Sequence, residues 1–111
     1  MQTYVTAESG TFNIHPLTFK RISAAGAQLR KDGVKIQDLD PETNPQMAAE
    51  IVRQCIAGWT LEGGADPLKG LTPKAARELL MEDPYVMAFV LSKAKDLADE
   101  WAKRFEVVSG N

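Results

Sequence analysis

Helix starts are the sequence feature that most limits how this chain can fold. Three of the points where a helix-capping residue is followed directly by a proline also precede apolar residues with helical spacing, namely Asn44-Pro45, Thr72-Pro73 and Asp83-Pro84. The capping side chain accepts a hydrogen bond from a free amide of the first turn, and proline at the first helical position has no amide to leave unpaired. A further proline, Pro16, precedes apolar residues with helical spacing. The chain is therefore expected to be mainly α.

Apolar residues recur at three- and four-residue steps after each of these starts, so each segment has one apolar face. We expect four helices, over residues 16–32, 45–59, 73–82 and 84–105. The second of them is the cleanest, with Glu50, Arg53 and Gln54 on the side opposite its apolar residues. The predicted core consists of Phe19, Ile22, Leu29, Ile51, Val52, Cys55, Ile56, Leu79, Leu80, Val90, Leu91, Ala94, Leu97 and Trp101.

The first fifteen residues have a different pattern. Two short β-favouring runs, residues 4–6 and 12–14, flank Glu8-Ser9-Gly10, whose glycine can take a positive φ. We expect a hairpin or extended segment over 1–15, with a frayed terminus as the alternative. A length of 111 residues suits one domain. The expected fold is a single domain over 1–111, made of four helices with a short N-terminal β-hairpin packed on them.

Composition and charge exclude several classes of protein. The chain is 44% hydrophobic and 25% charged, which is ordinary for a globular domain, and its net charge of −2 is too balanced for nucleic acid or an anionic membrane as the main partner. It has no run of apolar residues long enough to span a membrane. Cys55 is the only cysteine, and Met1–Pro16 does not resemble a signal peptide. We therefore expect a protein of a reducing cytoplasm.

Residues that could carry catalysis or bind a metal are scarce. His15, the only histidine, precedes a proline at the end of an expected strand, where a turn or capping role is far more probable than that of a general base. Cys55 lies at the centre of an apolar helix face and is expected to be buried and unreactive. The acids Asp38, Asp40 and Glu42 lack the other ligands of a calcium loop. We expect no catalytic residue, no metal and no cofactor.

A basic stretch offers a nucleic-acid hypothesis that the rest of the chain does not support. Its members are Lys20, Arg21, Arg30, Lys31 and Lys35. No aromatic residue shares that face, and no second basic element follows. A solvated helix face is the preferred interpretation.

Two aromatic residues of the last helix lie off its apolar stripe. Tyr85 and Phe89 share a side with polar and charged residues, so they either pack under the third helix or form a surface for a partner protein. Packing under the third helix is the simpler alternative, because that helix is adjacent in sequence. As a possible protein-interaction surface we select Tyr85 and Phe89, extended by Trp59 and the glycine-containing loop 60–71.

The order of elements resembles that of a known family. An apolar helix ends in Trp59, a glycine-containing loop follows, and Leu71-Thr72-Pro73 then opens a short helix with Leu79-Leu80 before Asp83-Pro84 and a long helix. This arrangement, over about residues 4–105, resembles the tail assembly chaperones of long-tailed, siphovirus-type bacteriophages.

The resemblance implies a function in the host bacterial cytoplasm. Such a chaperone binds the tape measure protein, a very long helical chain with exposed apolar faces, and keeps it soluble until the tail tube polymerises around it. A longer frameshifted form recruits the tail tube protein, and neither form remains in the mature virion. Many copies acting on one long client suggest a homo-oligomer.

Other classes of protein remain open at this stage. A small phage structural adaptor, such as a head–tail joining protein, would have similar size and helix content. A helical DNA-binding regulator would use the basic first helix, and an enzyme is the most distant alternative.

Overall fold

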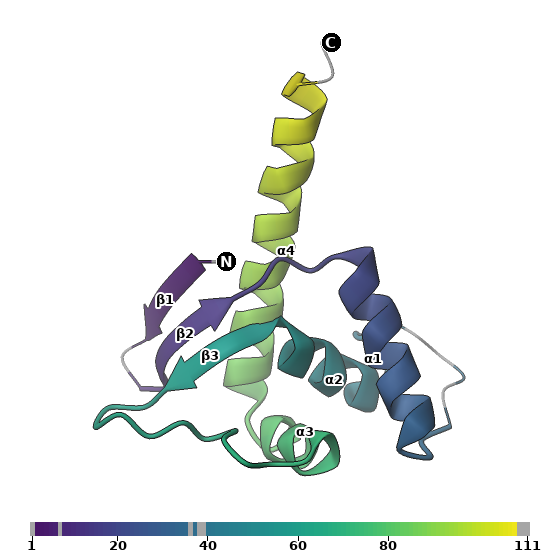
Figure 1. The fold of residues 1–111 in the computed structure, drawn as a ribbon, viewed down its shortest axis with the longest axis vertical. Helices are drawn as coiled ribbons and strands as arrows, with labels where there is room; N and C mark the ends of the chain where they lie inside the picture. Colours follow the sequence, from purple (N-terminus) through teal and green to yellow (C-terminus); the bar gives the residue numbers. More distant parts are fainter. Residues whose placement is uncertain (1, 7, 36, 38–39, 109–111) are drawn as a thin grey trace.

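A computed structural model of the chain describes residues 2–6, 8–35, 37 and 40–108, with the side chains of 104–108 left out. Asp38 therefore lies outside the described residues, as do Met1 and Ala7 of the expected hairpin segment. Figure 1 shows the seven elements. In chain order they are β1 (Gln2–Thr6), β2 (Gly10–Ile14), α1 (Phe19–Lys31), α2 (Pro45–Cys55), β3 (Ile56–Thr60), α3 (Pro73–Met81) and α4 (Pro84–Val108).

The three helix starts predicted by a capping residue followed by proline are confirmed. Asn44 accepts hydrogen bonds from the first-turn amides of α2, Thr72 caps α3, and the carboxylate of Asp83 accepts from the amide of Val86 in α4. The first helix begins later than Pro16, because Thr18 caps it and Phe19 is its first residue. Its end at Asp32 and Gly33 agrees with the prediction, since Gly33 has a φ of +79°.

The expected fold class is wrong in one respect, which is the segment after α2. The helix predicted over 45–59 ends at Cys55, and residues 56–60 form the strand β3. This strand pairs antiparallel with β2, with Phe12 opposite Trp59 and Thr11 opposite Thr60. The molecule thus has four helices and a three-stranded antiparallel sheet of order β1-β2-β3, not a helical domain with a simple N-terminal hairpin.

Local preference and strand pairing together explain this difference. Ile56, Trp59 and Thr60 favour a strand, whereas Gly58 weakens a helix. Gly58 also lies close to the neighbouring strand, since a Cβ atom there would be 3.3 Å from Nδ2 of Asn13. The open edge of β2 supplies the backbone hydrogen bonds that a continued helix would otherwise provide.

Helix α2 is the central element, because it packs against α1, α3 and α4 and leads directly into β3. Much of the predicted core is confirmed. Buried as expected are Leu29, Ile51, Val52, Cys55, Leu80, Val90, Ala94 and Leu97, with Ile22, Ile56 and Leu91 half-buried against them. The core also contains residues that we did not select. These are chiefly Phe12, Ile14, Ala25, Met47, Ala49, Trp59, Ala76 and Val86.

Three residues assigned to the core are on the surface instead. Phe19 is 83% exposed, because it is the first residue of α1. Trp101 is 65% exposed, because the C-terminal part of α4 extends beyond the rest of the molecule (Figure 1). Leu79 is 36% exposed, while the inner face of α3 is formed by Ala76, Arg77 and Leu80.

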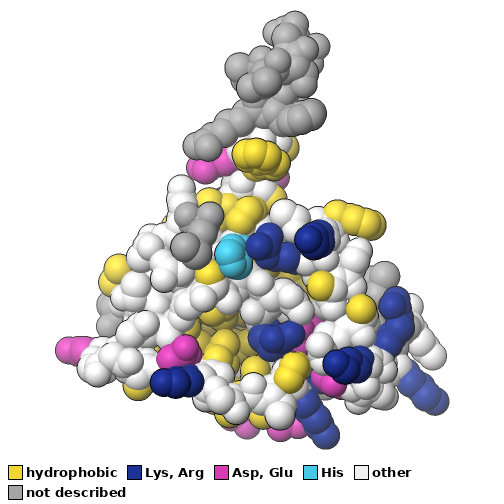
Figure 2. Space-filling view, viewed as in Figure 1, with side chains coloured by type: hydrophobic (Ala, Val, Ile, Leu, Met, Phe, Trp, Pro, Cys, Tyr) yellow, Lys and Arg dark blue, Asp and Glu magenta, His cyan; other side chains and the backbone are white. Residues whose placement is uncertain are grey.

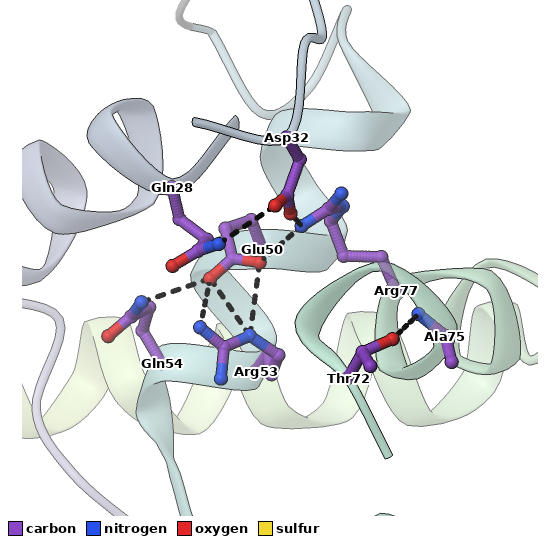
Figure 3. A network of polar contacts seen from close by, with 8 residues as sticks. All are labelled: Gln28, Asp32, Glu50, Arg53, Gln54, Thr72, Ala75 and Arg77. Atoms are coloured by element: carbon purple, nitrogen blue, oxygen red, sulfur yellow. Dashed lines mark hydrogen bonds and ion pairs between the residues drawn. The ribbon is translucent and has the colours of Figure 1, made fainter. Parts of the chain in front are cut away.

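A buried ionic network joins three helices (Figure 3). The side chain of Glu50 in α2 is fully buried, and Nη1 of Arg77 in α3 lies 2.9 Å from its Oε1. The same nitrogen lies 2.8 Å from Oδ2 of Asp32, which ends α1. Arg53 contacts both oxygens of Glu50, and Gln54 donates to Oε2 at 3.0 Å.

The network pairs the negative charge of Glu50, which would otherwise be very unfavourable in the interior. A buried carboxylate must be paired and hydrogen-bonded, and here one guanidinium nitrogen of Arg77 is shared between Glu50 and Asp32. The hydrogen bond from Arg77, with a second from Gln28, lowers the pKa of Asp32 below its ordinary value. The stability that this pairing contributes is therefore present at neutral pH and is lost as the pH falls through the lowered pKa.

Removing Arg77 should destabilise the protein strongly. Arg77→Ala leaves Glu50 buried without its partner from α3, so we expect the free energy of unfolding to fall by about 3–5 kcal/mol. The matched control is Lys74→Ala, an exposed residue of the same helix, which should change it by less than about 0.5 kcal/mol. Urea denaturation measures both, and equal stability of the two variants would contradict a structural role for the network.

Candidate protein-binding surface

The two off-stripe aromatics of α4 form the exposed end of a row of rings. Tyr85 and Phe89 are four positions apart, so they are neighbours on one face of the helix. Their rings stack with centroids 6.1 Å apart. Tyr85 is 56% exposed, whereas Phe89 is half-buried and packs against the core. One ring thus faces solvent and the other is anchored.

The row continues inward from Phe89. Its ring centroid is 5.7 Å from that of Phe12 in β2, which in turn stacks on Trp59 at 5.0 Å. Trp59 is only 5% exposed, and its Nε1 donates a hydrogen bond to the backbone oxygen of Ser9 at 2.6 Å. Trp59 is therefore a core residue at the buried end of the row, not part of an exposed surface.

Side chains of the sheet contact Phe89. Tyr4 of β1 meets the ring of Phe89 edge-on, with centroids 6.2 Å apart. The ammonium of Lys93, one turn further along α4, lies 5.4 Å from the Tyr4 ring and 5.8 Å from the Phe89 ring. The sequence places Lys93 on the same side of the helix as Phe89, but it does not identify Tyr4, because nothing in the chain order indicates that β1 lies beside α4.

We call Tyr4, Tyr85, Phe89 and Lys93 the aromatic surface. Burial raises the pKa of Tyr4, and the nearby carboxylates of Glu100 and Asp96 raise it further, so its hydroxyl is neutral at physiological pH. The surface combines apolar ring faces with one ammonium group. Rings of this kind are common anchors for the apolar face of a partner helix.

The loop of residues 61–71 follows β3 and begins beside the hairpin turn between β1 and β2. The amide of Leu61 donates to the backbone oxygen of Ala65 at 2.7 Å, and Gly63 and Gly64 both have positive φ. Leu61 lines a shallow hollow together with Val5, Gly10 and other residues of the hairpin. The loop thus presents apolar side chains beside the hairpin turn.

His15, Cys55 and Asp40, which were considered for catalysis or metal binding, take part in backbone contacts or the core. The amide of His15 donates to the backbone oxygen of Cys55 at 2.7 Å, which joins the end of β2 to the end of α2. Cys55 is buried, and burial raises the pKa of its thiol to about 11, so the thiol is protonated at neutral pH. Asp40 accepts a hydrogen bond from the amide of Glu42 within a turn.

The described residues lack two further features. No group of three or more His, Cys, Asp or Glu side chains there could hold a metal ion. None of the helices, within the part of the chain that the structure describes, is long and apolar enough to cross a membrane.

Comparison of the chain with protein-family models, curated proteins and solved structures finds no match.

Substitutions of Tyr85 and of Phe89 should differ in their effect on the free energy of unfolding. Tyr85→Ser removes a mostly exposed ring and should lower the free energy of unfolding by about 1 kcal/mol or less. Phe89→Ser removes a ring that contacts Tyr4 and Phe12 and should lower it by about 2–3 kcal/mol. Tryptophan fluorescence during urea unfolding, which changes as the buried Trp59 is exposed, measures both, and an unfolded Tyr85→Ser variant would show that Tyr85 belongs to the core.

Proposed function

We propose that this chain binds an apolar helical protein through the aromatic surface and keeps it soluble, as a phage tail assembly chaperone does for the tape measure protein. The observation that carries the proposal is the exposed ring of Tyr85 stacked on the anchored ring of Phe89. A soluble chain that leaves such a ring open at the end of a packed aromatic row has apolar surface available for a partner.

The geometry suits a client with an apolar helical face. Phe89 is held by Tyr4 and Phe12, so little side-chain freedom is lost when a partner packs on it. Tyr85 adds ring area, and its hydroxyl can remain hydrated at the rim of the contact. Lys93 beside the rings favours clients that carry acidic residues next to their apolar stripe.

The wider role follows from the resemblance to tail assembly chaperones. In this proposal the protein acts in the host bacterial cytoplasm, is not an enzyme and needs no cofactor. Its partners are the tape measure protein and, through a longer frameshifted form, the tail tube protein. Self-association belongs to the same proposal, because several copies along one client bind by avidity. The exposed Trp101 on the extended part of α4 is further apolar surface that an assembly would bury.

Co-expression with a tape measure fragment tests the proposal. Tyr85→Ser should reduce the soluble yield of the fragment several-fold while the variant itself stays folded, because only the exposed ring is lost. The matched control is Phe19→Ser, which removes another exposed aromatic far from Tyr85 in sequence and should leave the yield unchanged.

Two results would count against this function. If the folded Tyr85→Ser variant keeps the fragment as soluble as the unchanged protein does, the aromatic surface is not the binding site. If the unchanged protein gives no more soluble fragment than an unrelated domain of similar size, the chaperone proposal itself fails.

A further inference from the structure

A basic hollow lies between the first turns of α1 and the end of α2. Its volume is about 310 Å³, and it is lined by His15, Lys20, Arg21, Ala24 and Gln54. Figure 2 faces this side of the molecule and shows the single histidine, in cyan, beside Lys and Arg side chains. None of the lining residues is acidic, and the hollow shares no residue with the aromatic surface.

The positive charge of this hollow is not neutralised by neighbouring side chains. Within the described part of the chain, the ion pairs all belong to the network around Glu50 and Arg77, and neither Lys20 nor Arg21 takes part in one. Gln54 is already committed to that network, since its Nε2 donates to Glu50. Lys20 and Arg21 therefore line the hollow without an ion-pair partner among the described residues.

Arg21 is held in place at the edge of the hollow. Its Nη1 donates to the backbone oxygen of Pro16 at 3.1 Å, and the amide of the same residue closes the cap on Thr18. The same Nη1 also donates to Oγ1 of Thr18 at 3.5 Å, so among the described residues only Nε and Nη2 of this guanidinium keep N–H groups without an acceptor. A guanidinium fixed in this way presents free donors in the fork geometry that matches an oxyanion.

We propose that this hollow binds an oxyanion, a phosphate or carboxylate group, with Arg21 and Lys20 as its counter-charges and His15 as an additional donor. The small side chain of Ala24 leaves space at the wall of the hollow for the anion. The site lies outside the aromatic surface and goes beyond the proposed chaperone function. Its test therefore does not depend on any client protein.

The state of His15 should be coupled to the anion. Burial lowers the pKa of His15, and the charge of Arg21 lowers it further. Lys20 also lines the hollow from α1, and the neutral Gln54 lines it from α2. Cys55, whose thiol is protonated, contacts His15 only through its backbone oxygen. A bound anion favours the imidazolium and raises the pKa, so by linkage the anion must bind more tightly as the pH falls through that pKa.

Proton NMR of His15 tests this site directly, because the chain has one histidine and its ring signals need no assignment among others. Inorganic phosphate and acetate are titrated separately, each against sodium chloride of equal ionic strength. We expect at least one of the two anions to raise the pKa of His15 saturably, by about one unit, and chloride to have no saturable effect. Comparison of the phosphate and acetate arms distinguishes a phosphate site from a carboxylate site.

Two variants and one control test whether Arg21 and Lys20 are responsible for the anion-dependent shift in the pKa of His15. Arg21→Gln should raise the pKa of His15 in the absence of phosphate, since a repelling charge is removed, and should abolish the saturable response. Lys20→Gln should weaken the response several-fold without disturbing the bond to Pro16. Arg30→Gln removes an exposed cation from the same helix outside the hollow and should behave like the unchanged protein. The proposal is overturned if neither anion gives a saturable shift, or if all three variants respond alike.

Discussion

The burial of Glu50 is the constraint on which the arrangement of the helices depends. Its carboxylate has no access to solvent, so every one of its interactions must come from the protein. Arg53 and Gln54 supply part of them from α2 itself, but Arg77 must come from α3. Because the same nitrogen of Arg77 also contacts Asp32, the end of α1 is positioned by the same interaction. The ionic network thus joins α1, α2 and α3, while apolar contacts hold α4 and the sheet.

Aromatic rings, in contrast, hold the sheet against α4. Trp59 and Phe12 stack within the sheet, and Phe89 of α4 packs against Phe12. Tyr4 and Phe12 of the sheet pack against Phe89, whereas Tyr85 remains more than half exposed. The buried rings of Trp59 and Phe12 are therefore joined through Phe89 to the exposed ring of Tyr85 in one continuous row. This continuity gives the aromatic surface its rigidity, which a binding site built on a mobile loop would lack.

The sequence predicted those features that short-range interactions decide. Asn44, Thr72 and Asp83 mark helix starts because a cap acts within one turn. The strand β3 was not predicted, because Ile56 and Trp59 also fit a helical apolar stripe, and only pairing with β2 separates the two possibilities. Periodicity identified the inner face of α4 correctly at Val90, but it does not indicate where the body of the protein ends, so Trp101 was misplaced.

The candidate site, like the fold, was predicted only in part from the sequence. Tyr85 and Phe89 were selected because they lie off the helix stripe, and the structure places them in contact with each other. Trp59 was included as an extension of that surface, but it is buried by stacking on Phe12, a contact between residues far apart in the chain. The ionic network was not anticipated, since Glu50 has the spacing of an ordinary polar helix face and no sequence pattern links it to Arg77.

The central claim is that a partner protein contacts Tyr85, and site-specific photo-crosslinking tests it most directly. A photoreactive phenylalanine analogue is placed at position 85 in one sample and at position 74 of α3 in another, each co-expressed with the tape measure protein. Position 74 is the control because Lys74 is exposed and lies outside the aromatic surface. The account predicts a covalent adduct with the tape measure protein from position 85 and none from position 74. Equal adduct from both positions, or none from position 85 while the two proteins still purify together, would contradict it.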